Sequence, residues 1–281
     1  MLTQATGIAK KAEILLIGNE LLIGKTRDLN AFWLGKQVSQ FGISVTRVTI
    51  IHDDVKEIAS VLNEIITRKP DYAFTSGGLG PTFDDETIEG IARGLNRKLY
   101  LDEKALGWLR ERYEKGFKAG TMKDPGINES RKKMAYMPVG STALHNNAGA
   151  APGVLIVEKS TKIFILPGVP REMQAIFTEE IAPILHVENP TIKFHEFDFI
   201  VDNVGESTMA AQINALMAEI DDRIWIKSHA KFDGTKYYVD MHVSGYGDDA
   251  FRKNVEEVAT KVRKIVLDLG GMIRETEKEE E

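Results

Sequence analysis

The first two thirds of the chain alternate short apolar runs with longer stretches in which apolar positions recur at helical spacing. The short runs predict buried strands over 13–18, 43–51, 72–75, 154–158 and 162–166. The longer stretches predict helices over 28–41, from Asp53 or Asp54 to Arg68, and over 85–95 and 102–119. The loop-rich segment 120–153 carries one further helix near 128–135, and another begins at Pro170. Strands that alternate with helices predict parallel βαβ units in a layered α/β domain.

After Asn189-Pro190 the pattern changes to strand (194–201), helix (206–219), hairpin and long helix (248–269), which is typical of a small α+β domain. Asp233-Gly234 predicts a two-residue turn. That turn would place Trp225, Lys227 and His229 opposite His242, Asp240 and Tyr238 on a polar face. The core face would then consist of Ile224, Ile226, Phe232, Val239, Met241 and Val243. We therefore expect a tail (1–11), an α/β domain (12–188), an α+β domain (189–272) and an acidic tail (273–281).

Composition narrows the classes of function. The 281 residues contain no Cys, which excludes disulfides, zinc–thiolate sites and Cys nucleophiles and favours a cytoplasmic protein. No apolar run approaches the ~20 residues that span a bilayer, and the first eleven residues are too polar for a signal peptide, so we expect no membrane partner. The formal net charge is −6. Most of the acidic excess lies after residue 190, which argues against a nucleic-acid partner there.

The segment Ser76-Gly77-Gly78-Leu79-Gly80-Pro81-Thr82 follows a predicted strand directly. Successive glycines allow backbone N–H groups to converge on an anion, as at phosphate sites. No Gly-Lys-Ser/Thr follows, so the segment is not a P-loop, and its third Gly is misplaced for a dinucleotide-binding fingerprint. On spacing alone, a phosphate-binding loop and a tight strand-to-helix turn are both open interpretations.

Acidic residues cluster behind this loop and at neighbouring strand ends. Asp84, Asp85 and Glu86 would repel a bound phosphate unless a divalent cation such as Mg²⁺ or Mn²⁺ lay between them. The alternative is that Asp84 or Asp85 caps the next helix. Asp53 follows the second predicted strand and would either cap the next helix or face a ligand cleft beside the glycine loop. Glu20 follows the first predicted strand.

Other catalytic constellations find little support. The six histidines show no HExxH or HxH spacing, and no Gly-x-Ser-x-Gly nucleophile elbow is present. His229, Lys227, Lys231, Lys236 and Tyr238 form a polar sheet face for which solvent exposure is the simpler interpretation.

Five segments in order resemble the competence/damage-inducible protein A (CinA) family: GNELLIGKTRDLNAFWL (18–34), TSGGLGPTFDDET (75–87), NESRKKMAYMPVGS (128–141), AGAAPG (148–153) and ILPGVPREM (165–173). The resemblance implies a molybdopterin-binding fold, shared with MogA and MoeA: three layers around a mostly parallel sheet. Residues 190–270 resemble the family's small KH-like domain, and Val204-Gly205-Glu206-Ser207 is the first stretch of the range that carries this resemblance. Many bacterial members carry a further nicotinamide-mononucleotide deamidase domain, and because this sequence stops at Glu281 we do not expect deamidation.

The resemblance also implies site residues. By position, Asp85 and Asp53 match functionally important acids, and Thr75 to Thr82 match the ligand loop. Asp84 and Asp85 would hold a divalent metal (Mg²⁺, Mn²⁺ or Co²⁺, with K⁺ as a further candidate ion), and Asp53 or Glu172 would orient a water. Asn128, Arg131 and Lys132 would bind phosphates. The matching segments add Glu20, Asn30, Pro167 and Gly168 as ligand-binding candidates.

Two functions follow from the resemblance. The leading expectation is a divalent-metal-dependent pyrophosphatase acting on ADP-ribose, FAD or a related dinucleotide and releasing AMP. The alternative is a module that binds molybdopterin or its nucleotide without hydrolysis. A nucleic-acid-binding role is a third interpretation, which the acidic charge and the lack of a basic Gly-x-x-Gly in the second domain oppose. We expect that domain to complete a homodimer or cover the site.

Overall fold

The computed structural model describes residues 9–276, which form two compact units. The α/β unit comprises residues 10–39 and 44–188, and the α+β unit comprises residues 40–43 and 189–276 together with Ala9. The remainder of the two predicted tails, residues 1–8 and 277–281, lies outside the described residues. Residues 10–11 and 273–275, which we assigned to the tails, lie in strands.

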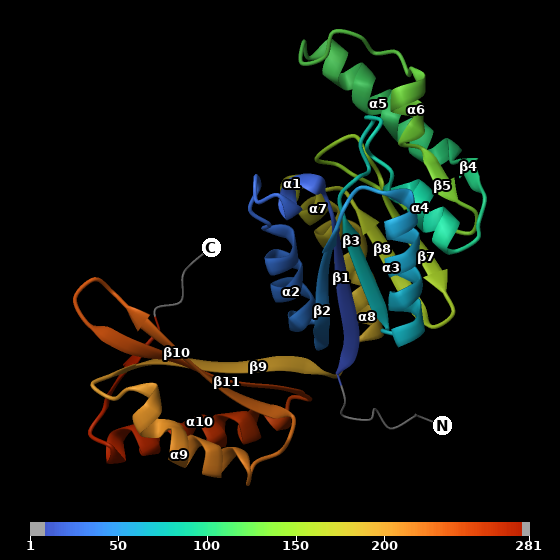
Figure 1. The fold of residues 1–281 in the computed structure, drawn as a ribbon. Helices are drawn as coiled ribbons and strands as arrows, with labels where there is room; N and C mark the ends of the chain where they lie inside the picture. The colour runs from blue at the N-terminus through green and yellow to red at the C-terminus, as the bar shows by residue number, and fades with distance from the viewer. Residues whose placement is uncertain (1–8, 277–281) are drawn as a thin grey trace. The chain divides into compact units, whose positions relative to one another are not determined.

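The α/β unit is built on one sheet with the strand order β2-β1-β3-β8-β7-β6 (Figure 1). Its strands are β1 (Lys10–Ile17), β2 (Ile43–Ile51), β3 (Tyr72–Ser76), β6 (Thr142–Leu144), β7 (Gly153–Glu158) and β8 (Thr161–Leu166). Strand β3 runs parallel to both β1 and β8, as the alternating pattern predicts. Strand β7 runs antiparallel to β8, because the hairpin that links them is too short for a parallel crossover. Strand β6 in turn runs antiparallel to β7.

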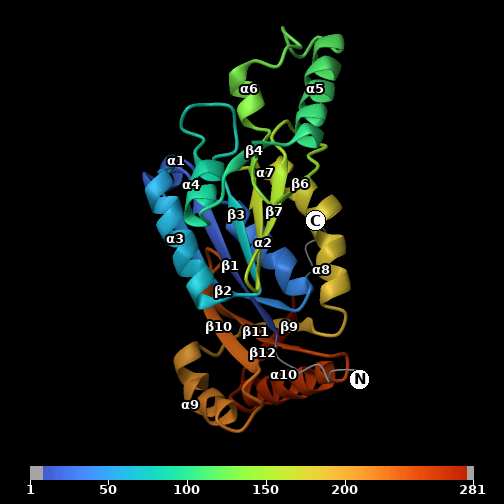
Figure 2. The ribbon, with the colours of Figure 1, turned by 90° about the vertical axis from the view of Figure 1, so that its right-hand side faces the viewer.

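Helices cover both faces of this sheet and make three layers (Figures 1 and 2). They are α1 (Asn19–Leu22), α2 (Asn30–Gln40), α3 (Val55–Arg68), α4 (Thr87–Gly94), α7 (Pro170–Ile176), the π-helical turn η1 (Phe177–Ile181) and α8 (Ala182–Glu188). On one face Phe74 and Phe164 stack at 5.3 Å between ring centres, and Phe177 links them to Trp33 of α2. On the other face Leu15 and Ile163 share a core with Ile58 of α3. Successive strand residues thus serve opposite faces.

The segment between α4 and β7 contains more structure than its sequence pattern predicts. Besides α5 (Glu103–Lys118) and α6 (Glu129–Lys133), it forms a two-stranded sheet of β4 (Leu99–Leu101) and β5 (Tyr136–Pro138). Strands β4, β5 and β6 are three residues long, too short to show a period. The stripe Leu106, Leu109 and Tyr113 of α5 is buried, as predicted.

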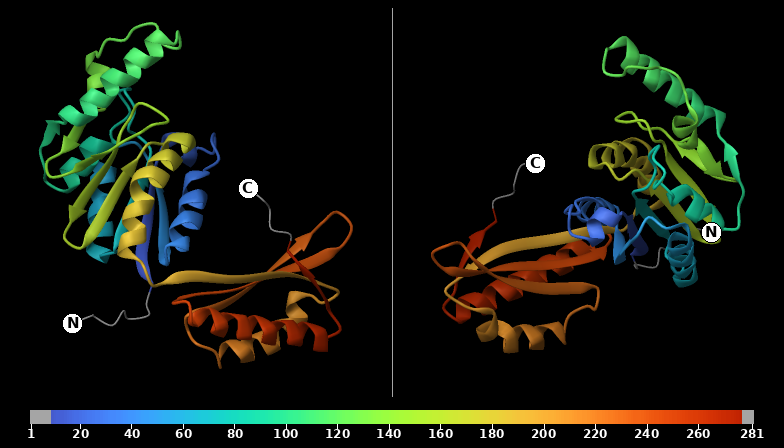
Figure 3. Two further views of the ribbon diagram at one scale, coloured as in Figure 1. Left: turned by 180° about the vertical axis from the view of Figure 1, so that it is seen from behind. Right: turned by 45° about the horizontal axis from the view of Figure 1, so that its top comes forward.

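The α+β unit is an antiparallel sheet with the order β10-β11-β9-β12. Its strands are β9 (Lys193–Asp202), β10 (Ile224–Phe232), β11 (Tyr237–Gly247) and β12 (Met272–Glu275). Helices α9 (Glu206–Met217) and α10 (Phe251–Asp268) cover the same face of this sheet (Figure 3). Phe199, Met241 and Val243 of the strands pack there with Val255 and Val262 of α10.

The predicted register of the β10–β11 hairpin is wrong by two residues. Lys227 lies opposite His242, and His229 lies opposite Asp240. The turn takes up Asp233 to Lys236, because Asp233 Oδ1 accepts hydrogen bonds from the backbone N–H groups of Thr235 and Lys236. An even shift leaves each side chain on its predicted face, so Ile224, Ile226, Val239, Met241 and Val243 are buried, but Phe232 is exposed rather than part of the core.

We expect Gly77→Ala to destabilise the α/β unit by about 2 kcal/mol or more. Gly77 has φ 119°, and an added Cβ would lie 1.9 Å from the carbonyl oxygen of Ile17. Chemical denaturation monitored by circular dichroism measures the change. Gly35→Ala is the matched control, because Gly35 is helical with open space beside it, and we expect a gain of about 0.5–1 kcal/mol. Equal effects of the two substitutions would contradict this account of the loop.

Candidate functional site

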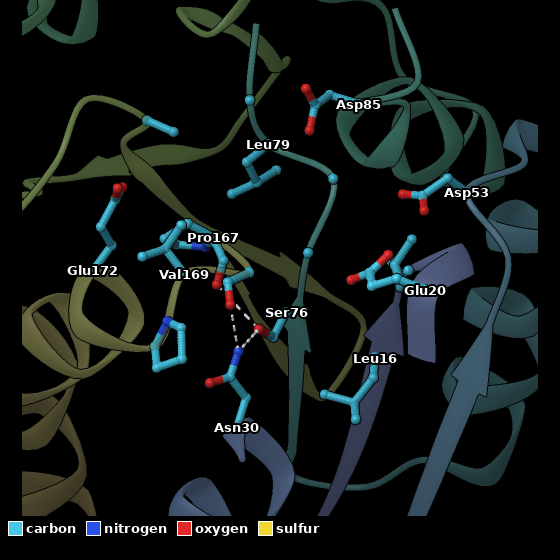
Figure 4. A pocket seen from close by; sticks show the side chains of 18 of the residues that line it. Leu16, Glu20, Asn30, Asp53, Ser76, Leu79, Asp85, Pro167, Val169 and Glu172 are labelled. Carbon is cyan, nitrogen blue, oxygen red and sulfur yellow. Dashed lines mark hydrogen bonds between the residues drawn. The ribbon is translucent and has the colours of Figure 1, made fainter. Parts of the chain in front are cut away.

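A cavity of about 600 Å³ lies at the carboxyl ends of β1, β3 and β8 (Figure 4). Its walls are the segments that follow these strands, residues 16–21, 76–85 and 167–172, together with the loop that leads into α2. Parallel α/β sheets bind their ligands at this edge, and the volume lies in the range of small-molecule sites.

The glycine loop after β3 presents backbone donors to this cavity. Thr87 holds two carbonyl groups of this loop. Its Oγ1 donates to the Gly77 carbonyl at 2.9 Å, and its backbone N–H donates to the Gly78 carbonyl at 3.2 Å. Over the described part of the chain, no protein acceptor pairs with the N–H groups of Gly78, Leu79 or Gly80. Three successive unpaired donors on one turn are the arrangement that binds an oxyanion.

Asn30 ties the two sides of the cavity together. Its side-chain amide donates to Ser76 Oγ at 2.9 Å and to the Gly168 carbonyl at 2.8 Å, and Ser76 Oγ donates to the Pro167 carbonyl at 3.0 Å (Figure 4). The oxygen of this amide, Asn30 Oδ1, is buried and has no hydrogen-bond partner among the described atoms. Asn30, Ser76, Pro167 and Gly168, all predicted candidates, therefore form one rigid part of the wall.

The predicted acids do not all behave as helix caps. Asp54, not Asp53, caps α3, by accepting from the N–H groups of Lys56 and Glu57. Helix α4 begins at Thr87 without a side-chain cap, so neither Asp84 nor Asp85 has the capping role that was the alternative interpretation. Both carboxylates instead accept from the hydroxyl of Thr82. That hydroxyl carries one proton and satisfies one carboxylate at a time.

Two aspartates of the cavity have opposite pKa shifts. Partial burial, followed by the negative charges of Glu20, Asp85 and Asp84, raises the pKa of Asp53, although the N–H of Asn19 opposes the shift. The hydrogen bond from Thr82 lowers the pKa of Asp84. Asp53 and Glu20 lie on the same side of the cavity as Asp85 in Figure 4. The surroundings of Asp53 therefore disfavour its charged form.

Glu172 of α7 lies across the cavity from these acids (Figure 4). Asn146, which is buried, donates to Glu172 Oε2 at 2.7 Å and to the Ala151 carbonyl at 2.8 Å. A Cβ on Gly149 would lie 1.9 Å from the Glu172 carboxyl carbon, so the loop 146–151 fits closely around this side chain. Glu172 is thereby held in one orientation.

The predicted phosphate-binding residues of the 128–141 segment lie outside the cavity wall. Asn128 caps α6 through the N–H of Arg131, the Arg131 guanidinium stacks on Tyr113 at 3.9 Å, and Lys132 pairs with Glu129 at 3.7 Å. The neighbouring Lys133 does reach the loop and donates to the Thr82 carbonyl at 2.7 Å. Thr75 is buried beneath the loop, and Gly80 and Pro81 line the cavity as predicted.

Sequence reasoning missed several residues of the site. Arg27 lines the cavity, Thr87 anchors the glycine loop, and Asn146 orients Glu172. Each lies inside or beside a segment that carries the family resemblance, which was the available signal. The roles of Thr87 and Asn146 depend on partners 9 to 26 residues away, which no local pattern shows.

A second, smaller cavity of about 280 Å³ lies on the other side of the same loop. It shares Gly78, Leu79, Gly80 and Asp85 with the first, and Ile88, Tyr136 and Pro152 contribute apolar surface to it. The loop thus contributes to two neighbouring cavities, and charged side chains (Asp85, Glu89, Glu129 and Lys133) also line the smaller one.

Comparison with known proteins places the α/β unit in a family. The sequence model of a family described as "Probable molybdopterin binding domain" matches residues 13–187. A protein of Metallosphaera sedula is 39% identical over 265 residues, 93% of this chain and 96% of that protein. Protein TK1472 of Thermococcus kodakarensis is 40% identical over 250 residues, 89% of this chain and 96% of its own length.

Among solved structures, the protein CinA of Thermoplasma acidophilum, described as of unknown function, is 35% identical with a TM-score of 0.56. The match covers 62% of this chain and 99% of that one.

No helix within residues 9–276 is both long and apolar enough to cross a membrane.

We expect Asp53→Asn to raise the melting temperature at pH 7, by a few degrees at most because the side chain is partly exposed. The folded protein raises the pKa of this carboxyl, so Asp53 lowers stability once the pH exceeds that pKa, and the gain from the substitution should disappear in acid. Differential scanning calorimetry between pH 3 and pH 8 measures it. Asp54→Asn keeps the cap of α3 and should give no rise. A lower melting temperature for Asp53→Asn at pH 7 would show that the charge is not strained.

Proposed function

We propose, given that the chain belongs to the CinA family and carries its molybdopterin-binding domain at residues 13–187, that the cavity binds a phosphate-bearing pterin of the molybdopterin type or its nucleotide. The observation that carries the proposal is the glycine loop. Gly78, Leu79 and Gly80 present three unpaired N–H groups to a cavity of small-molecule size. The smaller cavity beside the loop has Tyr136, Ile88 and Pro152 in its wall, which suit an aromatic ring of the same ligand.

The charge of the cavity implies a cation in the bound complex. Its acidic lining residues are Glu20, Asp28, Asp53, Asp84, Asp85 and Glu172, and Arg27 is the one basic residue of the wall. A phosphate would meet more negative than positive charge there. Asp84 and Asp85 fit a divalent cation, because both carboxylates line the cavity and both meet at the Thr82 hydroxyl, which brings two sets of carboxylate oxygens together. When bound, Mg²⁺, Mn²⁺ or Co²⁺ would offset the charge of the phosphate.

Asp85→Asn should change the affinity for a phosphate ligand in opposite directions with and without metal. In a chelator the variant should bind ADP-ribose or a phosphorylated pterin more tightly than the unaltered protein, because one repelling charge is gone. With Mg²⁺ it should bind about tenfold more weakly, roughly 1.4 kcal/mol, because a cation ligand is lost. Isothermal titration calorimetry measures both.

Glu111→Gln removes an exposed carboxylate of α5 outside the cavity and is the matched control, with no change expected in either condition. Failure of the unaltered protein to bind any phosphorylated pterin or nucleotide, with or without Mg²⁺, would refute the binding proposal. An effect of Asp85→Asn in the same direction under both conditions would refute the cation.

Metal-dependent hydrolysis of a nucleotide pyrophosphate is the second candidate function. The observation that favours it is Glu172, a carboxylate that Asn146 orients across the cavity from the glycine loop. In that position Glu172 would accept a proton from a water whose oxygen attacks phosphorus, and the bridging P–O bond would break to release AMP. Asp53, with its raised pKa, is the alternative residue for orienting that water.

Incubation with ADP-ribose, FAD and NAD in the presence of Mg²⁺, Mn²⁺ or Co²⁺ tests hydrolysis through the release of AMP. Glu172→Gln should lower kcat about 100-fold or more while ligand affinity changes little. Glu179→Gln, whose carboxylate pairs with Asn147 outside the cavity, is the matched control and should keep full activity. If no combination releases AMP while a phosphate ligand still binds, the site binds without hydrolysis.

The other expectations from the sequence stay predictions. They are a role for K⁺, a homodimer, a cytoplasmic location and the absence of a nucleic-acid partner.

A further inference from the structure

One face of the small α+β sheet carries polar side chains and is not covered by its helices. Helices α9 and α10 pack on the face that bears Phe199, Met241 and Val243. The alternate residues of the strands point to the opposite side, which we call the open face. On it lie Glu196, Asp198, Lys227, His229, Lys231, Asp240 and His242.

Three side chains of the open face converge. Asp198 and Glu196 are two residues apart on β9, and His242 of β11 lies directly opposite Asp198 in the strand register. One ligand atom from each side chain lies within 4.8 Å of the other two, and His242 Nδ1 is 2.7 Å from Asp198 Oδ1. Across residues 9–276 this is the one group of three His, Asp or Glu side chains that meets this distance. Adjacent strands hold the three positions at fixed separations.

A fourth side chain provides a second, independent observation. Asp240 is buried, with 9% of its surface exposed, and its Oδ1 has no hydrogen-bond partner among the described atoms. Its Oδ2 lies 3.6 Å from His242 Nε2, the ring nitrogen that faces away from Asp198 and Glu196. Metal-binding histidines commonly present the second ring nitrogen to a carboxylate in this way. Asp240 therefore lies beside this ring nitrogen, just beyond hydrogen-bond distance, and a slightly closer approach would let it receive the Nε2–H when Nδ1 binds a cation.

We infer that Glu196, Asp198 and His242 form a binding site for a divalent transition-metal ion of the Zn²⁺ class, with Asp240 as the residue that positions His242. One imidazole and two carboxylates are donors that Zn²⁺ accepts, and three protein ligands leave a position for water or a further ligand. Imidazole disfavours Mg²⁺ and Ca²⁺, which prefer oxygen ligands alone. The site is separate from the cavity of the α/β unit and does not depend on the function proposed for it.

A structural ion pair between His242 and Asp198 is the competing interpretation. Two lysines also lie on the open face: Lys227 lies opposite His242, and Lys231 binds Asp240 at 2.5 Å. Lys231 pairs with Asp240, and Asp198 is the carboxylate 2.7 Å from the imidazole. An ion pair would need His242 protonated, whereas a metal would need it neutral. The two interpretations therefore differ in their response to added metal.

Titration of the untagged full chain with Zn²⁺ after removal of chelator tests the inference. We expect one Zn²⁺ per chain that raises the melting temperature, together with a change in the ¹⁵N shift of His242 Nδ1. His242→Ala should weaken this binding at least about 100-fold, and Asp240→Asn about tenfold without abolishing it. Asp198→Asn supplies a second ligand variant, so that a folding defect of one substitution does not decide the result.

Two control variants separate this site from other cation sites. His186→Ala removes a histidine of α8 and should leave Zn²⁺ binding unchanged. A double substitution of Asp84 and Asp85 by Asn removes the cation ligands proposed for the cavity, and the binding that depends on His242 should persist. If Zn²⁺ does not bind, or binds equally well to His242→Ala and Asp198→Asn, the inference is wrong and the pair is a structural contact.

Discussion

The candidate site depends on one steric constraint: the chain that leaves β3 passes so close to the end of β1 that no side chain fits between them. A Cβ at Gly77 would lie 1.9 Å from the Ile17 carbonyl oxygen, and one at Gly78 would lie 2.3 Å from Thr87 Oγ1. Because both residues are glycines, the loop can turn its carbonyl groups toward Thr87 while the N–H groups of Gly78, Leu79 and Gly80 keep no protein acceptor among the described residues. The parallel order β1-β3-β8 then places the Asn30 and Glu172 segments around the same loop.

The second constraint is electrostatic. Acidic side chains outnumber the single Arg27 in the cavity wall, and the raised pKa of Asp53 shows that the protein places that charge at a cost. Such strain is characteristic of sites whose charges are used by a ligand rather than by the fold. Backbone donors that favour an anion, beside carboxylates that repel it, fit a ligand that arrives with a cation. Ligand binding and hydrolysis would both use this arrangement, but only hydrolysis would require Glu172.

Much of the fold could be predicted from the pattern of apolar positions. The parallel strands, the helices after them and the change of pattern at Asn189 all appear in the structure, because each strand or helix of five residues or more displays its own period. The three-residue strands were missed because they are too short to show a period. The hairpin register was wrong because the side chain of Asp233 stabilises a longer turn than Asp-Gly suggests. Phe232 then lies beyond the core although its apolar character predicts burial.

For the site, the sequence alone determined the chemistry that is available: glycines after a strand, acids behind them and a family resemblance that placed both at one sheet edge. These are properties of neighbouring residues, which local backbone geometry and charge express directly. Only the tertiary structure decided which side chains meet. It brought Asn146 to Glu172, placed the Arg131 guanidinium on Tyr113 rather than in the cavity wall, and joined Glu196, Asp198 and His242 across two strands. Most of these contacts link distant positions, and their distances depend on how the strands and helices pack, which no local pattern encodes.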